Sequence, residues 1–255
     1  MTQHHLIGRT EKEVLWFQRR GFLQAAAAWT AMGGAAMAQA QTRSNIVEIS
    51  GDATLNGERL TPQHTIQTGD SIATGPGSTL IFVLGSSAFH VRQNTMMSVD
   101  RGASLLAVSL LRMITGAVVS VWGKGNKRLI MTPTITAGIR GTGVYTEIFA
   151  SQEGRSYLCN CYGDVEVKAG GDQVLSRSSY HQSFWGEVAP KNGRMLTPAG
   201  AINHTDEELE FLARLAGQRT AWQIAGHKGI KNGMGYMEEK AGQMHPAEML
   251  GKPSY

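Results

Sequence analysis

Residues 132–167 contain the feature that most limits how this chain can fold, a series of short β-prone segments separated by glycines. The sequence TPTITAGIRGTGVYTEIFASQEGRSYLCNCYGDVEV has extended segments at 134–137, 143–149 and 155–162, then a Gly163-Asp164 turn into 165–168. β-Branched and aromatic residues suit a pleated, half-buried surface. Gly138, Gly141 and Gly143 permit a positive φ or a close strand crossing. The block therefore predicts tightly crossing β-strands, with Arg140 making a structural contact at the crossing.

The two cysteines of the chain, Cys159 and Cys161, lie in the last extended segment of this block. Alternate residues of a β-strand point to the same face of a sheet. We therefore expect both thiols on one side of the strand.

Composition and turn spacing extend the β prediction to most of the chain. The chain has 31 glycines and only 17% charged residues, while 42% hydrophobic residues are enough for a core. Asn56-Gly57 favours a two-residue hairpin, and 79–84 is a continuous apolar run typical of a buried strand. Alternation in 87–93 places His90 off the core face, where we expect it to be solvated. Residues 105–114 fit either a short helix or a strand. We predict an all-β domain, either a sandwich or a solenoid-like β roll.

The character of the sequence changes after Pro190. Asn192-Gly193 and Pro198 indicate a loop, and Thr205 with Glu208 forms a capping-box pattern before an apolar stripe of leucines. We predict one amphipathic helix at about 205–216, packed on the β domain. Beyond Gly226 no periodicity is sustained, so we expect a mobile tail.

Residues 1–40 have the pattern of an export signal of the twin-arginine type. Arg19-Arg20 precede two apolar residues, and a weakly hydrophobic run at 24–37 ends in small residues. Polar interruptions make this run a poor membrane span, which needs about 20 predominantly apolar residues. We expect a cleaved signal and a periplasmic protein, with an uncleaved anchor as the alternative. The predicted organisation is a signal at 1–40, a β domain at 41–190 and a C-terminal extension at 191–255.

The charge of the chain gives no reason to expect a nucleic-acid partner. Residues 1–40 carry four of the 24 basic and two of the 20 acidic residues, so the formal net charge without them is +2 rather than +4. Nucleic-acid binding requires a clustered positive face, and none is evident.

The RGT at residues 140–142, followed by a strand, a charged turn, another strand and YGDVEV, resembles the signature of the FecR family of periplasmic domains. The resemblance extends upstream, so that it covers about residues 46–168, through 47–51, Asn56-Gly57, 68–91 and 115–123. FecR-type transducers also carry a cytoplasmic segment that restrains a sigma factor, and then a membrane span. Only about eighteen residues precede the arginine pair here. The resemblance therefore implies a stand-alone, exported FecR-like β domain.

Cys159 and Cys161 are the strongest candidates for chemistry. Two thiols on one strand face could bind a soft metal, with His181 and His204 as further ligands, and a Cys₂His₂ set suits Zn²⁺ or a copper ion. Three alternatives remain open: a disulfide between the two cysteines, for which their spacing gives poor geometry, a disulfide between molecules, and simple burial as small hydrophobes.

No motif in the sequence indicates an enzyme. The glycine pairs near 123 and 138–143 are followed by β-prone residues rather than by the helix that a phosphate-binding loop requires. No nucleophile-elbow or zinc-protease pattern is present. We expect a non-enzymatic periplasmic binding or interaction domain that holds a metal through the cysteine pair. The alternative is a structural or signalling-related envelope module that contacts a protein or glycan without metal.

Overall fold

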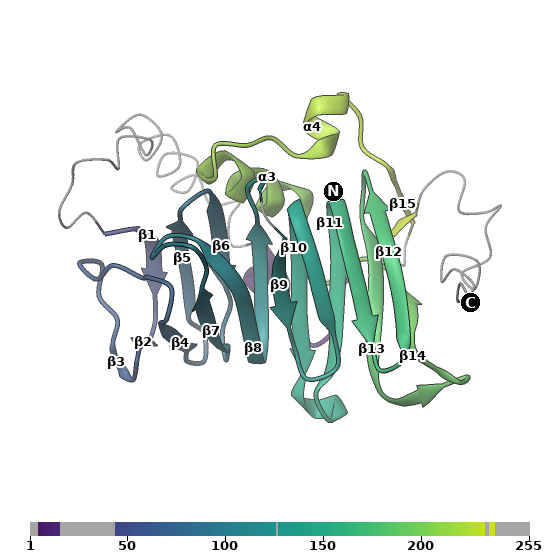
Figure 1. Cartoon of the computed structure of the whole chain (residues 1–255), viewed down its shortest axis with the longest axis horizontal. Helices are drawn as coiled ribbons and strands as arrows, with labels where there is room; N and C mark the ends of the chain where they lie inside the picture. The colour runs from purple at the N-terminus through teal and green to yellow at the C-terminus, as the bar shows by residue number, and fades with distance from the viewer. Residues whose placement is uncertain (1–4, 16–43, 126, 233–234, 238–255) are drawn as a thin grey trace.

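A computed structural model describes residues 5–15, 44–125, 127–232 and 235–237 (Figure 1). Strands make up most of it, which confirms the predicted all-β class. The strands are β1 (Ile46–Ser50), β2 (Ala53–Leu55), β3 (Glu58–Arg59), β4 (Ser71–Thr74), β5 (Thr79–Leu84), β6 (Ser87–Val91), β7 (Met96–Arg101), β8 (Val108–Val121), β9 (Arg128–Met131), β10 (Thr136–Phe149), β11 (Arg155–Ala169), β12 (Asp172–Ser178), β13 (Gln182–Lys191), β14 (Arg194–Ala199), β15 (Ile230–Asn232) and β16 (Gly235–Met237). The helices are α1 (Glu11–Val14), the 3₁₀ turn η2 (Ala150–Gln152), α3 (Asp206–Leu215) and α4 (Ala221–Ala225).

Strands β1 to β14 form one hydrogen-bonded sheet with two halves. The first half contains β1, β5, β6, β13 and β14, and the second contains β2, β3, β4, β7, β9 and β12. Three long strands, β8, β10 and β11, run through both halves. In β11, for example, residues 156–160 pair with β13 and residues 163–169 pair with β12.

A glycine with positive φ lies where each long strand passes from one half to the other. These residues are Gly116 in β8 (φ 80°), Gly141 in β10 (φ 57°) and Gly163 in β11 (φ 97°). Only glycine adopts such angles at low cost, and in a strand they produce a bulge and a bend. The pairing register of β10 and β11 shifts at this point, between Arg140 and Gly143. The Gly163-Asp164 turn predicted from the sequence is therefore wrong, because the chain bends here and continues as one strand.

The bends bring the apolar faces of the two halves together in one inner core. Its members alternate along the strands, as Leu80, Phe82 and Leu84 do in β5, and they include Leu111 and Val165 from the second half. The opposite face of the second half carries exposed residues. The first half is buried on both faces, and this explains the continuous apolar run of β5.

A second core lies on the outer face of the first half. Strand residues there pack under α3, α4 and residues 201–202, and Figure 1 shows both helices at one side of the strands. His90 lies under this cover and is only 2% exposed. The expectation that His90 is solvated was therefore wrong, since a face turned away from one core can be buried in another.

Helix α3 confirms the predicted C-terminal helix, and its N-cap is Thr205, whose hydroxyl accepts from the Glu208 amide at 3.3 Å. The Glu208 carboxylate does not complete a capping box. It accepts instead from His90 Nδ1 and Arg92 Nη2, both at 2.6 Å, and all three side chains are buried. Burial alone would raise the pKa of Glu208, but Arg92 and His90 outweigh it and lower the pKa to about 2.

The ends of the β domain differ from those predicted. β14 pairs with β13 across an Asn192-Gly193 turn with two positive φ angles, so the sheet extends past residue 190 to Ala199. Helix α4, capped by Thr220, and the β15–β16 hairpin follow α3. The predicted tail beyond residue 237 lies outside the described residues. Within the part of the chain that is described, no helix has the length and apolar content to span a bilayer.

Residues 5–15 precede the arginine pair, and the structure places them against the domain. Val14 is buried, and Arg9 forms an ion pair with Glu147 at 2.7 Å. The expectation that residues 1–40 stand apart from the fold therefore does not hold for this segment. The arginine pair and the apolar run lie outside the described residues, so the export signal stays a prediction.

Replacement of Gly163 tests the bend. A Cβ at Gly163 would lie 2.8 Å from Thr142 Cβ and would require a strained positive φ, whereas a Cβ at Gly171 would meet nothing within 4 Å. We expect Gly163→Ala to lower the free energy of unfolding by about 1–3 kcal/mol, and Gly171→Ala to change it by less than about 0.5 kcal/mol. Urea unfolding followed by tryptophan fluorescence measures both, and equal effects would contradict the role of the bend.

Replacement of Glu208 tests the cover over the outer face. The folded pKa of about 2 is below the ordinary 4.5, so this carboxylate stabilises the fold above pH 4.5 and loses that contribution as the pH falls toward 2. We expect Glu208→Gln to lower the free energy of unfolding by on the order of 3 kcal/mol at neutral pH. The difference in free energy of unfolding between the variant and the wild type should shrink as the pH falls from 4.5 toward 2. Glu58→Gln, at an exposed carboxylate, is the control and should show no such window.

Candidate metal site

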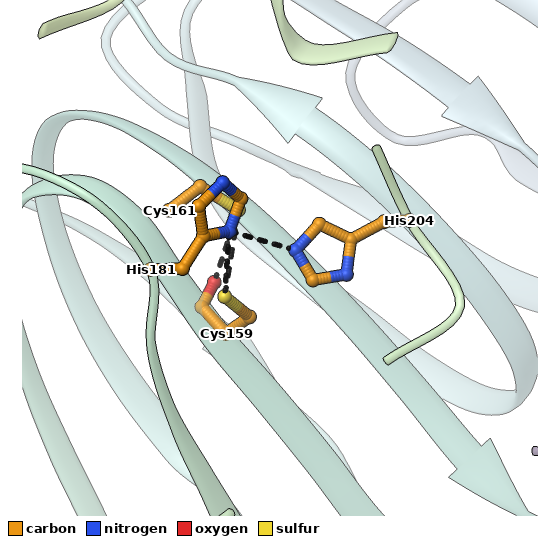
Figure 2. A group of neighbouring side chains, drawn as sticks. All are labelled: Cys159, Cys161, His181 and His204. Atoms are coloured by element: carbon orange, nitrogen blue, oxygen red, sulfur yellow. Dashed lines mark hydrogen bonds between the residues drawn. The ribbon is translucent and has the colours of Figure 1, made fainter. Parts of the chain in front are cut away.

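The structure brings together all four side chains that the sequence singled out as metal ligands (Figure 2). Cys159 and Cys161 alternate on the outer face of β11, as expected from their spacing. His181 lies between β12 and β13, where its amide donates to the Cys161 carbonyl at 3.0 Å. His204 lies between β14 and α3. Two other segments of the chain therefore bring their histidines to the cysteines of β11.

The ligand atoms have the spacing of a tetrahedral site. Cys159 Sγ lies 3.7 Å from Cys161 Sγ and 3.4 Å from His181 Nδ1. His181 Nδ1 lies 3.0 Å from His204 Nε2, and all four atoms are within 4.8 Å of one another. Zinc bonds of about 2.0–2.3 Å place tetrahedral ligand atoms about 3.3–3.8 Å apart. The observed separations, from 3.0 Å to at most 4.8 Å, bracket this range, so the side chains would shift to bind an ion at the centre.

Hydrogen bonds to the outer nitrogens fix the tautomer of each histidine. His181 Nε2 lies 3.0 Å from Asp206 Oδ1, and His204 Nδ1 faces the Ile202 carbonyl. Both oxygens can only accept, so each of these nitrogens carries the proton. The remaining nitrogens, His181 Nδ1 and His204 Nε2, lie 3.0 Å apart and face the thiols, so one of them holds a proton in the metal-free protein, and a bound ion would replace that proton. Outer partners of this kind orient the histidines of metal sites.

The electrostatics of the site favour one thiolate. Burial opposes ionisation of Cys159, but the hydrogen bond from Cys161 and the two imidazoles outweigh burial and hold the pKa of Cys159 well below its usual range. Burial and the neighbouring thiolate raise the pKa of Cys161 well above its usual range. Metal ligation requires the thiolate form, and Cys159 is poised to supply it.

Aromatic rings enclose the site. Tyr145 stacks on His204 with ring centroids 4.8 Å apart, and Trp222 of α4 stacks on His181 at 5.4 Å. Lys228 forms an ion pair with Asp206 at 2.9 Å, which holds the segment after α4 over the histidine pair. The four candidate ligands are almost entirely buried. A site with four protein ligands and no access for water is typical of structural rather than catalytic zinc.

The alternatives for the cysteines can now be compared with the geometry. Both are free and buried, so a disulfide between molecules would require local unfolding. The separation of 3.7 Å between the sulfur atoms exceeds the bond length of about 2.05 Å in a disulfide. Simple burial does not explain two imidazole nitrogens facing the thiols. The contacts favour a metal site, while metal binding itself stays a prediction.

Sequence reasoning missed the outer partners of the site. Asp206 belongs to no metal-binding motif, although its place two residues after His204 was a usable signal. Trp222 and Tyr145 carry no motif, since only the packing of α4 and β10 brings them to the histidines.

No family model and no curated protein matches this chain. The similar solved structures include two that are described as a "putative anti-sigma factor" from Parabacteroides distasonis. They share 14% and 13% identity over 52% and 54% of this chain, each with a TM-score of 0.43. The matches span 60% and 62% of those chains, less than two thirds of either. Membership of the FecR family stays a prediction from the sequence motifs.

Replacement of Asp206 tests the hydrogen bond that orients His181. Asp206→Asn keeps the side-chain shape but removes the charge that holds the His181 proton, so we expect zinc affinity to fall about 10–100-fold. Competition with a chromophoric chelator measures this affinity. Glu207→Gln removes a charge from the same helical turn without touching His181 and should leave the affinity within about twofold of wild type. Equal losses in both variants would contradict the assignment.

Proposed function

We propose that this protein is an exported, non-enzymatic interaction domain whose C-terminal extension is fixed to its β-sheet by a Zn²⁺ ion. The observation that supports the metal is the convergence of Cys159, Cys161, His181 and His204, with both histidine tautomers set for ligation. The FecR-like motifs and the arginine pair before an apolar run support the exported domain.

The donor set favours zinc over copper. Two thiolates and two imidazoles in tetrahedral arrangement suit Zn²⁺, whereas the electron-transfer copper sites use one thiolate, two imidazoles and a weak axial ligand. All four ligands come from the protein, and the site is closed. No coordination position is left for a substrate or a water molecule, which is the basis for proposing a structural role rather than catalysis.

The ion would join segments that are far apart in the chain. Cys159 and Cys161 belong to the sheet, whereas His204 leads directly into α3, and α3 covers His90 and Arg92. An unfolded chain does not hold these ligands together, so metal-binding free energy becomes folding free energy. The proposed role of zinc is to keep the extension closed over the outer face of the sheet, so that the domain presents a fixed surface to a partner.

Metal content and thermal stability of the purified full chain test the proposal. We expect about one zinc per wild-type chain by elemental analysis, and none above background in Cys159→Ser/Cys161→Ser. The variant and the chelated wild type should unfold at the same lower temperature. Loss of the ion should lower the free energy of unfolding by about 4 kcal/mol if the free zinc concentration is a thousand times the dissociation constant.

The control for this test is His227→Ala, because His227 is an exposed histidine outside the cluster. It should retain zinc and the melting temperature of the wild type. The proposed zinc site would be refuted if wild-type protein carries no zinc after purification and reconstitution. It would also be refuted if the double-serine variant retains one zinc per chain. Copper in place of zinc would refute the structural assignment of the ion.

A further inference from the structure

Residues 5–15 lie in a groove on the covered outer face of the sheet. The segment contains none of the candidate metal ligands, although the groove residue Asn203 directly precedes His204. We call this groove the N-terminal groove, and its polar residues are Arg92, Gln93, Glu147 and Asn203. It contacts the main chain of the segment and its Arg9 side chain, and Gln93 Nε2 donates to Glu13 Oε2 at 3.0 Å.

Asn203 recognises the main chain of the segment. Its side-chain Oδ1 accepts from the Ile7 amide at 2.6 Å, and its Nδ2 donates to the Ile7 carbonyl at 2.7 Å. The Asn203 amide donates to the His5 carbonyl at 2.9 Å. All three bonds go to main-chain atoms of the segment, so they do not depend on which side chains the segment carries.

Glu147 recognises the arginine of the segment. Glu147 is 4% exposed, and its Oε1 accepts from Arg9 Nε at 2.7 Å. Its Oε2 accepts from the Tyr145 hydroxyl at 2.6 Å and from Asn203 Nδ2 at 2.8 Å. Among the described residues, Arg9 is the only cation in ion-pair contact with Glu147. Without an arginine in this position the carboxylate would be a buried charge with no counter-ion, which is costly.

The segment does not fill the groove. A cleft of about 340 Å³ remains between Thr10, Lys12 and Glu13 of the segment and the sheet residues around Gln93. Protein interiors are generally close-packed. A segment built only to complete the core would leave less space. The loose fit is that of an occupant that can be exchanged.

We propose that the N-terminal groove is a binding site for an arginine-bearing peptide of a partner protein, and that residues 5–15 occupy it in cis. The required pattern is an apolar residue paired with Asn203 and an arginine two positions later on Glu147, as in Ile7-Gly8-Arg9. The export signal predicted at residues 1–40 includes this segment, so removal of the signal would free the groove. This inference does not depend on zinc.

The test uses full-length chains and a fluorescent peptide of residues 5–15. In wild type the tethered segment competes at an effective concentration of about millimolar, so we expect almost no binding of added peptide. Arg9→Ala weakens the tethered segment and leaves the groove intact. Fluorescence anisotropy should show at least about tenfold tighter binding of the peptide to this variant than to wild type.

Three controls define the chemistry of the groove. A peptide with alanine in place of its arginine should not bind the Arg9→Ala chain. Glu147→Gln in the Arg9→Ala background should remove binding of the original peptide. Lys12→Ala removes an exposed positive charge from the same segment and should behave as wild type. If Arg9→Ala binds no better than wild type, or if both peptides bind equally, the proposal is refuted.

A second measurement covers the case in which Arg9→Ala does not fold. A protease site inserted between Leu15 and Ser44 of the otherwise native chain is cut after folding, and the complex is followed by native mass spectrometry. The released segment should stay bound, and excess arginine peptide should displace it while the alanine peptide should not. Immediate loss of the segment, or displacement by both peptides alike, would refute the proposal.

Discussion

The positive φ at Gly116, Gly141 and Gly163 is the constraint on which the rest of the structure depends. These angles bend the three longest strands at the same level, so that one continuous sheet packs against itself. A side chain would collide with Thr95 at Gly116 and with Thr142 at Gly163, would press on Lys124 at Gly141, and would strain the backbone at all three. Because the inner core forms between the two halves, the outer face of the first half is left apolar and must be covered by other parts of the chain.

The cover over that face is held by buried polar contacts as well as by apolar packing. Glu208 of α3 bonds to His90 and Arg92, and Arg9 of the N-terminal segment bonds to Glu147. A buried charge that loses its partner is strongly destabilising, whereas two apolar surfaces can slide with little penalty. These pairs therefore specify one position for each covering segment. The candidate zinc ligands add a third such contact, with His204 on the cover and the thiols on the sheet.

This arrangement explains why the candidate metal site and the proposed peptide groove lie on the same face. Both need side chains from the sheet to meet side chains from a segment laid over it, in surroundings that exclude water and strengthen polar contacts. At one end Cys159 and Cys161 meet His204, and nearby Glu147 and Asn203 meet residues 5–15. Asn203 and His204 are adjacent, so a rigid metal site would also fix the residue that recognises the peptide main chain.

Sequence patterns alone predicted the all-β class, many of the strands, the helix α3 and the identity of the candidate ligands. Alternating apolar residues set the strand faces, Thr205 set the start of α3, and the two-residue spacing placed both thiols on one face, because these patterns depend only on local geometry. What the tertiary structure decided was how faces are covered. Gly163 became a bend rather than a turn, His90 became buried, and Asp206 became a partner of His181, since each outcome depends on contacts between residues distant in the chain, which no local pattern encodes.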